Sequence, residues 1–217
     1  STQCLALGFP NAPFNKGVNL SDWFNHEDSK YLRYDTYTDN DFADMASMGI
    51  DVVRLPLNFK AFMDANNNYS FGSDFLTALD YAVDLALQHN MYVILDQHSF
   101  YGSRWFPDNG EEIVTSGLRQ LAERYKDKND KVVYELFNEP GGNCAESGWG
   151  EMQRRLIAAI RAIDTKHWII ATPYGCGIDN LWDLPEYSDS KLIYTFHFYK
   201  PFLFTHQGAN WDGIPLQ

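Results

Sequence analysis

The residues best suited to chemistry are the tripeptide Asn138-Glu139-Pro140, which follows the apolar run VVYELF. A carboxyl group beside an amide at a strand end suits a general acid, whose pKa must be raised by burial and nearby charge. A solvated Glu in a turn is the alternative for such a tripeptide. Glu135 lies four residues earlier, about 13 Å away along an extended strand, too far for two carboxyl groups to act on one bond. We therefore expect Glu135 to be the buried structural partner of a cation.

A cation and two histidines end other apolar runs. Arg54 lies in VVRLPLN, and an Arg in an apolar strand needs an anion, most naturally a carboxylate bound through two parallel hydrogen bonds. The sequence leaves open whether that pair is structural or belongs to a site. His98 and His197 also follow strand-like runs. Each could bind a hydroxyl group or orient a carboxylate, or be a hydrogen-bonded core histidine.

Metal and thiol chemistry are the weaker alternatives. Four side chains are of types that bind zinc or manganese: Asp96, His98, Glu139 and His197. Because no HExxH, CxxC or HxH pattern occurs, we expect no metal and no other cofactor. The chain has 3 cysteines, which permit at most one internal bridge. Cys144 and Cys176 follow successive strands and could form it, and we expect the cysteines to be structural rather than catalytic.

Short apolar runs alternate with amphipathic stretches along the chain. The predicted strands are residues 18–20, 52–57, 91–96, 132–137, 168–172 and 191–198, and the predicted helices are residues 39–48, 73–88, 111–125 and 150–163. Strands that are apolar on both faces and separated by helices form parallel sheets covered by helices. The fold class is therefore α/β, in one domain over residues 1–217. No glycine-rich phosphate turn follows the first strand, which favours a barrel over a doubly wound sheet.

The candidate residues gather at the carboxyl ends of the predicted strands, where α/β barrels carry their sites. The composition of the chain limits the classes of ligand that could bind at this edge of the sheet. Lys and Arg number 17 against 29 Asp and Glu, so the net charge of −12 repels nucleic acid and anionic lipid. No run approaches the roughly 18 apolar residues that span a bilayer. Aromatic residues make up 16 % of the chain, and several lie in polar loop segments where exposed rings suit a ligand with flat apolar faces.

Five segments together resemble glycoside hydrolase family 5, the cellulase family of (β/α)8 barrels: GVNLSDWF, VVRLPLNF, VILDQH, VVYELFNEP and YTFHFYKPFLFTHQGANW. They occur in the family's order over about residues 16–211. The resemblance implies that Glu139 is the acid/base and that the other site residues are Arg54, His98, Asn138, His197 and Tyr199. Four tryptophans are candidate stacking platforms for sugar rings, or alternatively loop anchors: Trp23, Trp105, Trp149 and Trp211.

The resemblance also implies what the sequence lacks. The family's nucleophile is a Glu at the end of the seventh strand, whereas this sequence ends at Gln217 and has no Glu after Glu186. We therefore expect an incomplete barrel of about six βα units without the nucleophile. Asp96 is the one substitute to consider, and we expect it to be structural or to bind a hydroxyl group. Two open sheet edges predict a six-stranded barrel, an oligomer, or completion by a separate segment.

The function implied by the resemblance is a retaining endo-β-1,4-glucanase, impaired in this chain because the nucleophile strand is absent. Mixed-linkage glucan and mannan are alternative substrates. A non-catalytic β-glucan-binding protein and an inactive barrel fragment are the alternative functions. The expected partner is a β-glucan polysaccharide or oligosaccharide, not nucleic acid or a membrane. Because such polymers do not enter cells, we expect a secreted or periplasmic protein.

Overall fold

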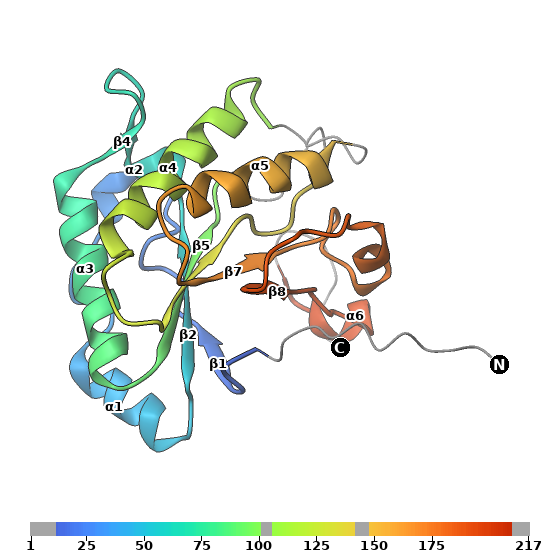
Figure 1. The fold of residues 1–217 in the computed structure, drawn as a ribbon. Coiled ribbons are helices and arrows are strands. Elements are labelled where there is room, and N and C mark those ends of the chain that lie inside the picture. The colour runs from blue at the N-terminus through green and yellow to red at the C-terminus, as the bar shows by residue number, and fades with distance from the viewer. Residues whose placement is uncertain (1–11, 101–105, 142–147, 210–217) are drawn as a thin grey trace.

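A computed structural model describes residues 12–100, 106–141 and 148–209 of the chain (Figure 1). Six strands form one sheet in the order β1-β2-β5-β6-β7-β8, and every neighbouring pair is parallel. Their bounds are β1 Gly17–Asn19, β2 Val52–Leu57, β5 Tyr92–Gln97, β6 Val132–Glu135, β7 Trp168–Ala171 and β8 Leu192–Tyr194. The predicted α/β class and all six predicted strands are confirmed, although β6 and β8 end earlier than expected.

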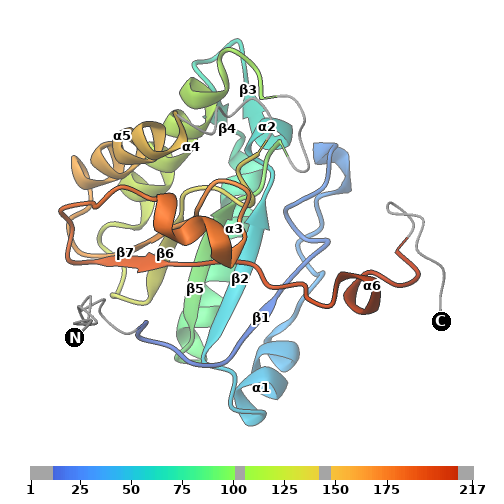
Figure 2. The same ribbon diagram turned by 90° about the vertical axis from the view of Figure 1, so that its right-hand side faces the viewer.

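Four long helices connect consecutive strands of the sheet: α1 Asp39–Ser47, α3 Ser73–Gln88, α4 Gly110–Tyr125 and α5 Trp149–Arg161. Figures 1 and 2 show these helices on one side of the sheet, with the other side facing residues 12–16 and α6, Phe202–Thr205. The connection from β7 to β8 instead contains a 3-10 helix, η2 Ile178–Asp183. Another 3-10 turn, η1, spans Ser29–Tyr31.

A small element that the sequence did not predict lies between β2 and α3. It consists of α2 Phe59–Phe62 and an antiparallel pair of two-residue strands, β3 Met63–Asp64 and β4 Ser70–Phe71. Strands of two residues have no period long enough to be read from a sequence.

The ends of α1 show how local sequence fixes an element. Thr38 is the N-cap, and Asp41 Oδ2 accepts hydrogen bonds from both the Thr38 amide and its hydroxyl at 2.7 Å. Gly49, at φ 76°, follows the last turn, which is the backbone conformation that glycine adopts most easily. Asp39 and Asn40 also have side chains of types that cap helices, but both lie within the helix. Thr38 is the cap because its extended backbone (φ −116°) leaves both of its donors free for Asp41.

Alternation along the strands gives the sheet two apolar faces. One face packs against the helices in the main core, which includes Val53, Leu55, Val93 and Leu95. The opposite face carries a second, smaller cluster of buried side chains: Val52, Ile94, Val133 and Ile170. Successive side chains of a strand point to opposite faces, so Arg54, Asp96 and Glu135 continue this second face toward the carboxyl ends of their strands.

The sheet curls without closing within the described residues. Among these, β1 pairs only with β2, and β8 only with β7. In Figure 1, β2 and β7 run in markedly different directions, as strands of a barrel wall do. The inner face therefore lines an open hollow rather than a filled barrel. Within the described residues, no helix is both long and apolar enough to cross a membrane.

Candidate active site

Glu139 lies four residues beyond the end of β6, at the carboxyl edge of the sheet. Its Oε1 atom is 2.6 Å from His197 Nδ1 and accepts a hydrogen bond of 3.0 Å from the Tyr199 hydroxyl. The Glu139 backbone has φ 31°, in the left-handed region that is costly for a residue with a Cβ. The segment after β8 thus orients the carboxylate of Glu139, whose strained backbone belongs to the loop after β6.

The His197 hydrogen bond, together with the charge of His197 and the Tyr199 hydroxyl, lowers the pKa of Glu139 despite its partial burial. Donors stabilise the charged form of a carboxyl group, which is why they lower its pKa. A general acid was expected to have a raised pKa, so that expectation is wrong for this structure. Burial alone would raise the pKa of Glu139, but the hydrogen bonds and the imidazoles around its carboxylate outweigh that effect.

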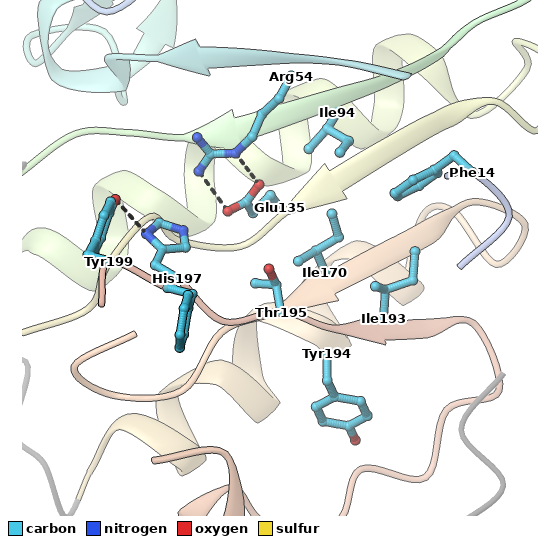
Figure 3. A pocket seen from close by; sticks show the side chains of 11 residues that line it. Phe14, Arg54, Ile94, Glu135, Ile170, Ile193, Tyr194, Thr195, His197 and Tyr199 are labelled. Carbon is cyan, nitrogen blue, oxygen red and sulfur yellow. Dashed lines mark hydrogen bonds and ion pairs between the residues drawn. The ribbon is translucent and has the colours of Figure 1, made fainter. Parts of the chain in front are cut away.

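Arg54 is the cation of the site and binds a carboxylate in the predicted manner. Its Nε and Nη2 atoms donate to Glu135 Oε2 and Oε1 at 2.7 and 2.8 Å (Figure 3). Nη2 also lies 2.8 Å from Asp96 Oδ2 and donates to Asn138 Oδ1 at 3.0 Å. Nη1 donates to Asn19 Oδ1 at 3.1 Å. The expectation that Glu135 is the buried partner of a cation is confirmed.

Two buried carboxylates therefore share one guanidinium. Asp96 and Glu135 are register partners on β5 and β6, and both are almost fully buried. Burial, followed by the charge of Asp96, raises the pKa of Glu135. The two acids raise the pKa of Arg54 further above its already high ordinary value, although its burial opposes this. His98 adds to the network, because its Nδ1 is 2.6 Å from Asp96 Oδ2.

Strand register explains why these residues meet. Asn19 is paired with Arg54 across β1 and β2, which brings the Asn19 amide to the guanidinium. After β6 ends at Glu135, the chain leaves the ladder, and the Asn138 amide donates to the Gln97 carbonyl at 2.9 Å. The strand had been expected to reach Phe137. Asn138 and Glu139 therefore lie beyond the last register pairs of β6, which are those of Glu135.

A cavity of about 360 Å³ opens on the inner face of the sheet beside this network (Figure 3). Its polar wall includes Arg54, Glu135, Thr195, His197 and Tyr199. The remaining wall is mainly apolar and comes from β5, β7 and β8 and from the segments before β1 and after β8: Phe14, Ile94, Ile170, Ile193, Tyr194 and Phe198. Flat apolar surface next to hydrogen-bonding groups suits a sugar ring, which presents both.

Two of the four proposed stacking tryptophans do not face the cleft. Trp23 is fully buried and donates from Nε1 to the Arg33 carbonyl at 2.9 Å. Trp149 is buried at the start of α5 and donates to the Thr172 carbonyl at 2.7 Å. Neither ring offers a free face, so their proposed stacking role is wrong and both are anchors. Trp105 and Trp211 lie outside the described residues.

Two candidates were missed in the sequence. Trp182 in η2 is 80 % exposed, and its polar neighbours in IDNLWD were the signal for an exposed ring. Cys176 carries a free thiol, and Cys144, its suggested partner in a bridge, lies outside the described residues. Burial and the negative charge of Glu139 raise the pKa of the Cys176 thiol to about 12. Nothing in the sequence placed this thiol beside Glu139.

Comparison with known proteins agrees with the geometry. The family model for cellulase, glycosyl hydrolase family 5, matches residues 10–213. This chain belongs to glycosyl hydrolase family 5. Among its relatives, endoglucanase C of Acetivibrio thermocellus is 30 % identical over 211 residues, which are 92 % of this chain and 61 % of the relative. Cellodextrinase A of Ruminococcus flavefaciens is 31 % identical over 214 residues, 92 % of this chain and 63 % of the relative.

Solved structures of the family share the fold. The cellulose synthase subunit Z of Clostridioides difficile is 29 % identical with a TM-score of 0.86, over 94 % of this chain and 68 % of that one. Thermotoga maritima Cel5A in complex with cellobiose is 29 % identical with a TM-score of 0.83, over 93 % and 66 %. The expected family and its barrel fold, incomplete here, are therefore confirmed. This chain spans about three fifths of the length of the curated relatives named above.

Proposed function

We propose that the domain to which these residues belong is a retaining endo-β-1,4-glucanase in which Glu139 is the acid/base. One observation carries the proposal: the Glu139 carboxylate is fixed by His197 and Tyr199 at the carboxyl edge of the sheet. This is the edge where barrels of this type carry their catalytic residues. Relatives named endoglucanase and cellodextrinase support a β-1,4-glucan substrate.

The retaining mechanism assigns two tasks to Glu139. It first protonates the leaving glycosidic oxygen while a second carboxylate attacks the anomeric carbon, and it then deprotonates the water that releases the glycosyl-enzyme. We assign hydroxyl binding to Asn138, His98 and His197, which surround Glu139 and Arg54. Arg54 would face the attacking carboxylate through Nη1, which here donates to Asn19.

The attacking carboxylate is the missing part of this scheme. The other two acids of the described site, Asp96 and Glu135, are both bound by Arg54, and Glu135 uses both of its oxygens in doing so. A carboxylate held in this way is a poor nucleophile. We therefore propose that the 217-residue chain by itself hydrolyses β-glucan slowly or not at all. A second carboxylate close to Glu139 would also raise its pKa, which the proton donor requires.

Substrate choice and location complete the proposal. Gluco-configured β-1,4 chains are the preferred substrate, with mixed-linkage glucan and mannan as alternatives. A structure of Thermotoga maritima Cel5A with mannotriose, 28 % identical with a TM-score of 0.82, supports keeping mannan among them. Because these polymers lie outside cells, we place the protein in a secreted or periplasmic setting.

The test measures binding and cleavage together. Calorimetry with cello-oligosaccharides and an assay of new reducing ends on soluble β-glucan are run on the parent chain, on Glu139→Gln and on Glu151→Gln, an exposed control on α5. We expect binding by all three, with affinity changed only in Glu139→Gln, and negligible cleavage.

The other results have defined meanings. Cleavage by the parent that is lost in Glu139→Gln alone would show that the chain holds a second reactive carboxylate, and equal cleavage by both would exclude Glu139 as the acid. Binding that Glu139→Gln does not change would favour a non-catalytic β-glucan-binding protein. An absence of binding in the parent would favour an inactive barrel fragment.

A further inference from the structure

Three different metal-binding side chains meet at the carboxyl edge of the sheet. The carboxylate of Glu139, the thiol of Cys176 and the imidazole of His197 bring one ligand atom each within 4.8 Å of one another. All three residues are partly buried, so each can be reached from solvent without unfolding. We propose that this triad is a binding site for zinc(II) or a cation of similar softness.

The backbone holds the three ligands together before any ion arrives. The Gly175 amide donates to the Pro140 carbonyl at 2.7 Å, and the His197 amide donates to the Cys176 carbonyl at 2.8 Å. These two bonds join the loop after β6, the loop after β7 and the segment after β8. Cys176, like Glu139, has a positive φ, 54°. A site whose ligands are already positioned loses less conformational entropy when the ion binds.

The ligand set selects the ion. Zinc binds thiolate, imidazole and carboxylate groups, and sites with three protein ligands leave a fourth position for water. Calcium and magnesium require oxygen ligands in larger number, so a Glu-Cys-His triad disfavours both. The Tyr199 hydroxyl, which donates to Glu139 Oε1, would act as the outer hydrogen bond that usually orients a metal-binding carboxylate.

One distance must change when the ion enters. His197 Nδ1 and Glu139 Oε1 are 2.6 Å apart, whereas two ligands of one tetrahedral zinc ion, with bonds of about 2.0 Å, lie about 3.3 Å apart. Separating these two atoms opens their hydrogen bond, so the Glu139 side chain must rotate while its hydrogen bonds with the Tyr199 hydroxyl and the Cys176 thiol readjust. The thiol must also lose its proton, and this cost makes the site weaker than a structural zinc centre.

The metal site stands independently of the proposed function, because it requires only the positions of the three ligands. If Glu139 is also the acid/base, a bound cation would occupy the atoms that carry the proton. Metal binding and proton transfer would then exclude each other, so zinc would act as an inhibitor rather than as a cofactor.

The test uses cobalt(II) chloride, because a cobalt–thiolate bond gives a near-ultraviolet charge-transfer band. The measurements are made on the full chain carrying Cys4→Ser and Cys144→Ser, so that Cys176 is the sole thiol. We expect the band to saturate at one cobalt per chain and to disappear when zinc chloride is added. His197→Ala and Glu139→Ala should each weaken cobalt binding about tenfold or more. Removing a residue that only hydrogen-bonds to a metal ligand already costs about this much, and the removal of a ligand should cost at least as much.

A second histidine–carboxylate pair provides the control. His89 Nε2 lies 2.7 Å from Asp39 Oδ1 on the helical side of the molecule, so His89→Ala removes a similar pair and should leave the cobalt titration unchanged. Circular dichroism verifies that each variant folds, and His197→Gln replaces His197→Ala if the latter does not. A parent chain with no thiolate band in excess cobalt would overturn the proposal. A band that persists undiminished in both His197 variants or in Glu139→Ala would do the same.

Discussion

At the scale of single residues, Arg54 decides the charge balance of the site. Its guanidinium neutralises part of the charge of two carboxylates that the sheet has already removed from water. Buried acids without a cation are costly because their desolvation is not compensated. The network therefore ties the stability of the sheet to the same residues that shape the cavity.

Replacing Arg54 with methionine should remove this compensation while keeping most of the side-chain volume. We expect Arg54→Met to lower the free energy of unfolding by about 3–5 kcal/mol at neutral pH, measured by urea denaturation. The pKa of Glu135 is already raised, so its folded value lies above its unfolded value. The loss of stability in Arg54→Met should therefore be largest at pH values above the folded pKa of Glu135. It should shrink as the pH falls through that pKa, because protonation of Glu135 removes its buried negative charge.

An exposed ion pair serves as the comparison for Arg54. Arg155 on α5 binds Glu111 on α4 at 2.6 and 2.9 Å in solvent, and Arg155→Met should cost no more than about 1 kcal/mol. Equal losses in the two variants would contradict the idea that the carboxylates near Arg54 depend on it.

Tyr199 contributes to the lowered pKa of Glu139, after the larger effect of His197. Because its hydroxyl stabilises the charged carboxylate, Tyr199→Phe should raise the pKa of Glu139, as followed by a carbon-13 NMR titration. Folding lowers the pKa of Glu139 below its ordinary value of 4.5. The Tyr199 hydroxyl therefore stabilises the folded protein at pH values above 4.5, and this contribution is lost as the pH falls through the folded pKa of Glu139. An unchanged or lower Glu139 pKa in the variant would show that the hydrogen bond does not form.

At the scale of elements, one Asp joins α5 to β7. Asp164 Oδ2 is 2.5 Å from His167 Nδ1 and accepts a hydrogen bond of 2.9 Å from Tyr134 on β6. Its Oδ1 accepts from the amides of Lys166 and His167. The turn that starts β7 is therefore fixed to the neighbouring strand by one buried carboxylate.

Asp164→Asn should destabilise the protein by about 1–3 kcal/mol at neutral pH, because an amide nitrogen replaces one of the accepting oxygens. These donors lower the pKa of Asp164 against its burial. The Asp164 carboxylate therefore contributes its full stability at pH values above its ordinary pKa of 3.8, and this contribution is lost as the pH falls through the lowered folded pKa. The stabilities of the parent chain and of Asp164→Asn should therefore become equal in acid. Thermal unfolding across this range tests it, with exposed Asp127→Asn as the neutral control; a constant difference at all pH values would contradict the assignment.

At the scale of the whole molecule, the open sheet is the dominant feature. Among the described residues, β1 and β8 each have one unpaired edge. Beside β8 lies a run of exposed apolar side chains: Phe196, Phe198, Tyr199, Phe202, Leu203 and Phe204. Unpaired strand edges next to exposed apolar surface favour association.

We therefore expect the 217-residue chain to associate in solution, with a mass by light scattering above that of one chain. Phe198→Ser combined with Phe204→Ser should shift the protein toward the single chain, because these side chains are 60 % and 69 % exposed and lie outside the core. Tyr31→Ser, a change of an exposed ring elsewhere, should have no such effect. A parent chain that runs as a monomer at all concentrations would refute the association.

The periodicity of the sequence determined the α/β class and the positions of the six strands and the four long helices along the chain. It could do so because burial on one or two faces imposes a repeat on the residues themselves. The order of the motifs along the chain indicated the family and, through it, five site residues that the structure brings together: Arg54, Asn138, Glu139, His197 and Tyr199. Burial of Trp23 and Trp149 could not be predicted, because their loop-like surroundings do not show which neighbours cover them.

Only the tertiary structure decided how the site is charged. The separations along the chain, 81 residues between Arg54 and Glu135 and 58 between Glu139 and His197, carry no information on which donor meets which carboxylate. The lowered pKa of Glu139 and the thiol of Cys176 beside it follow from loops of three different strands meeting at one edge. Sequence patterns record which face of an element is apolar, whereas electrostatics depends on distances between elements, and these exist only once the sheet has formed.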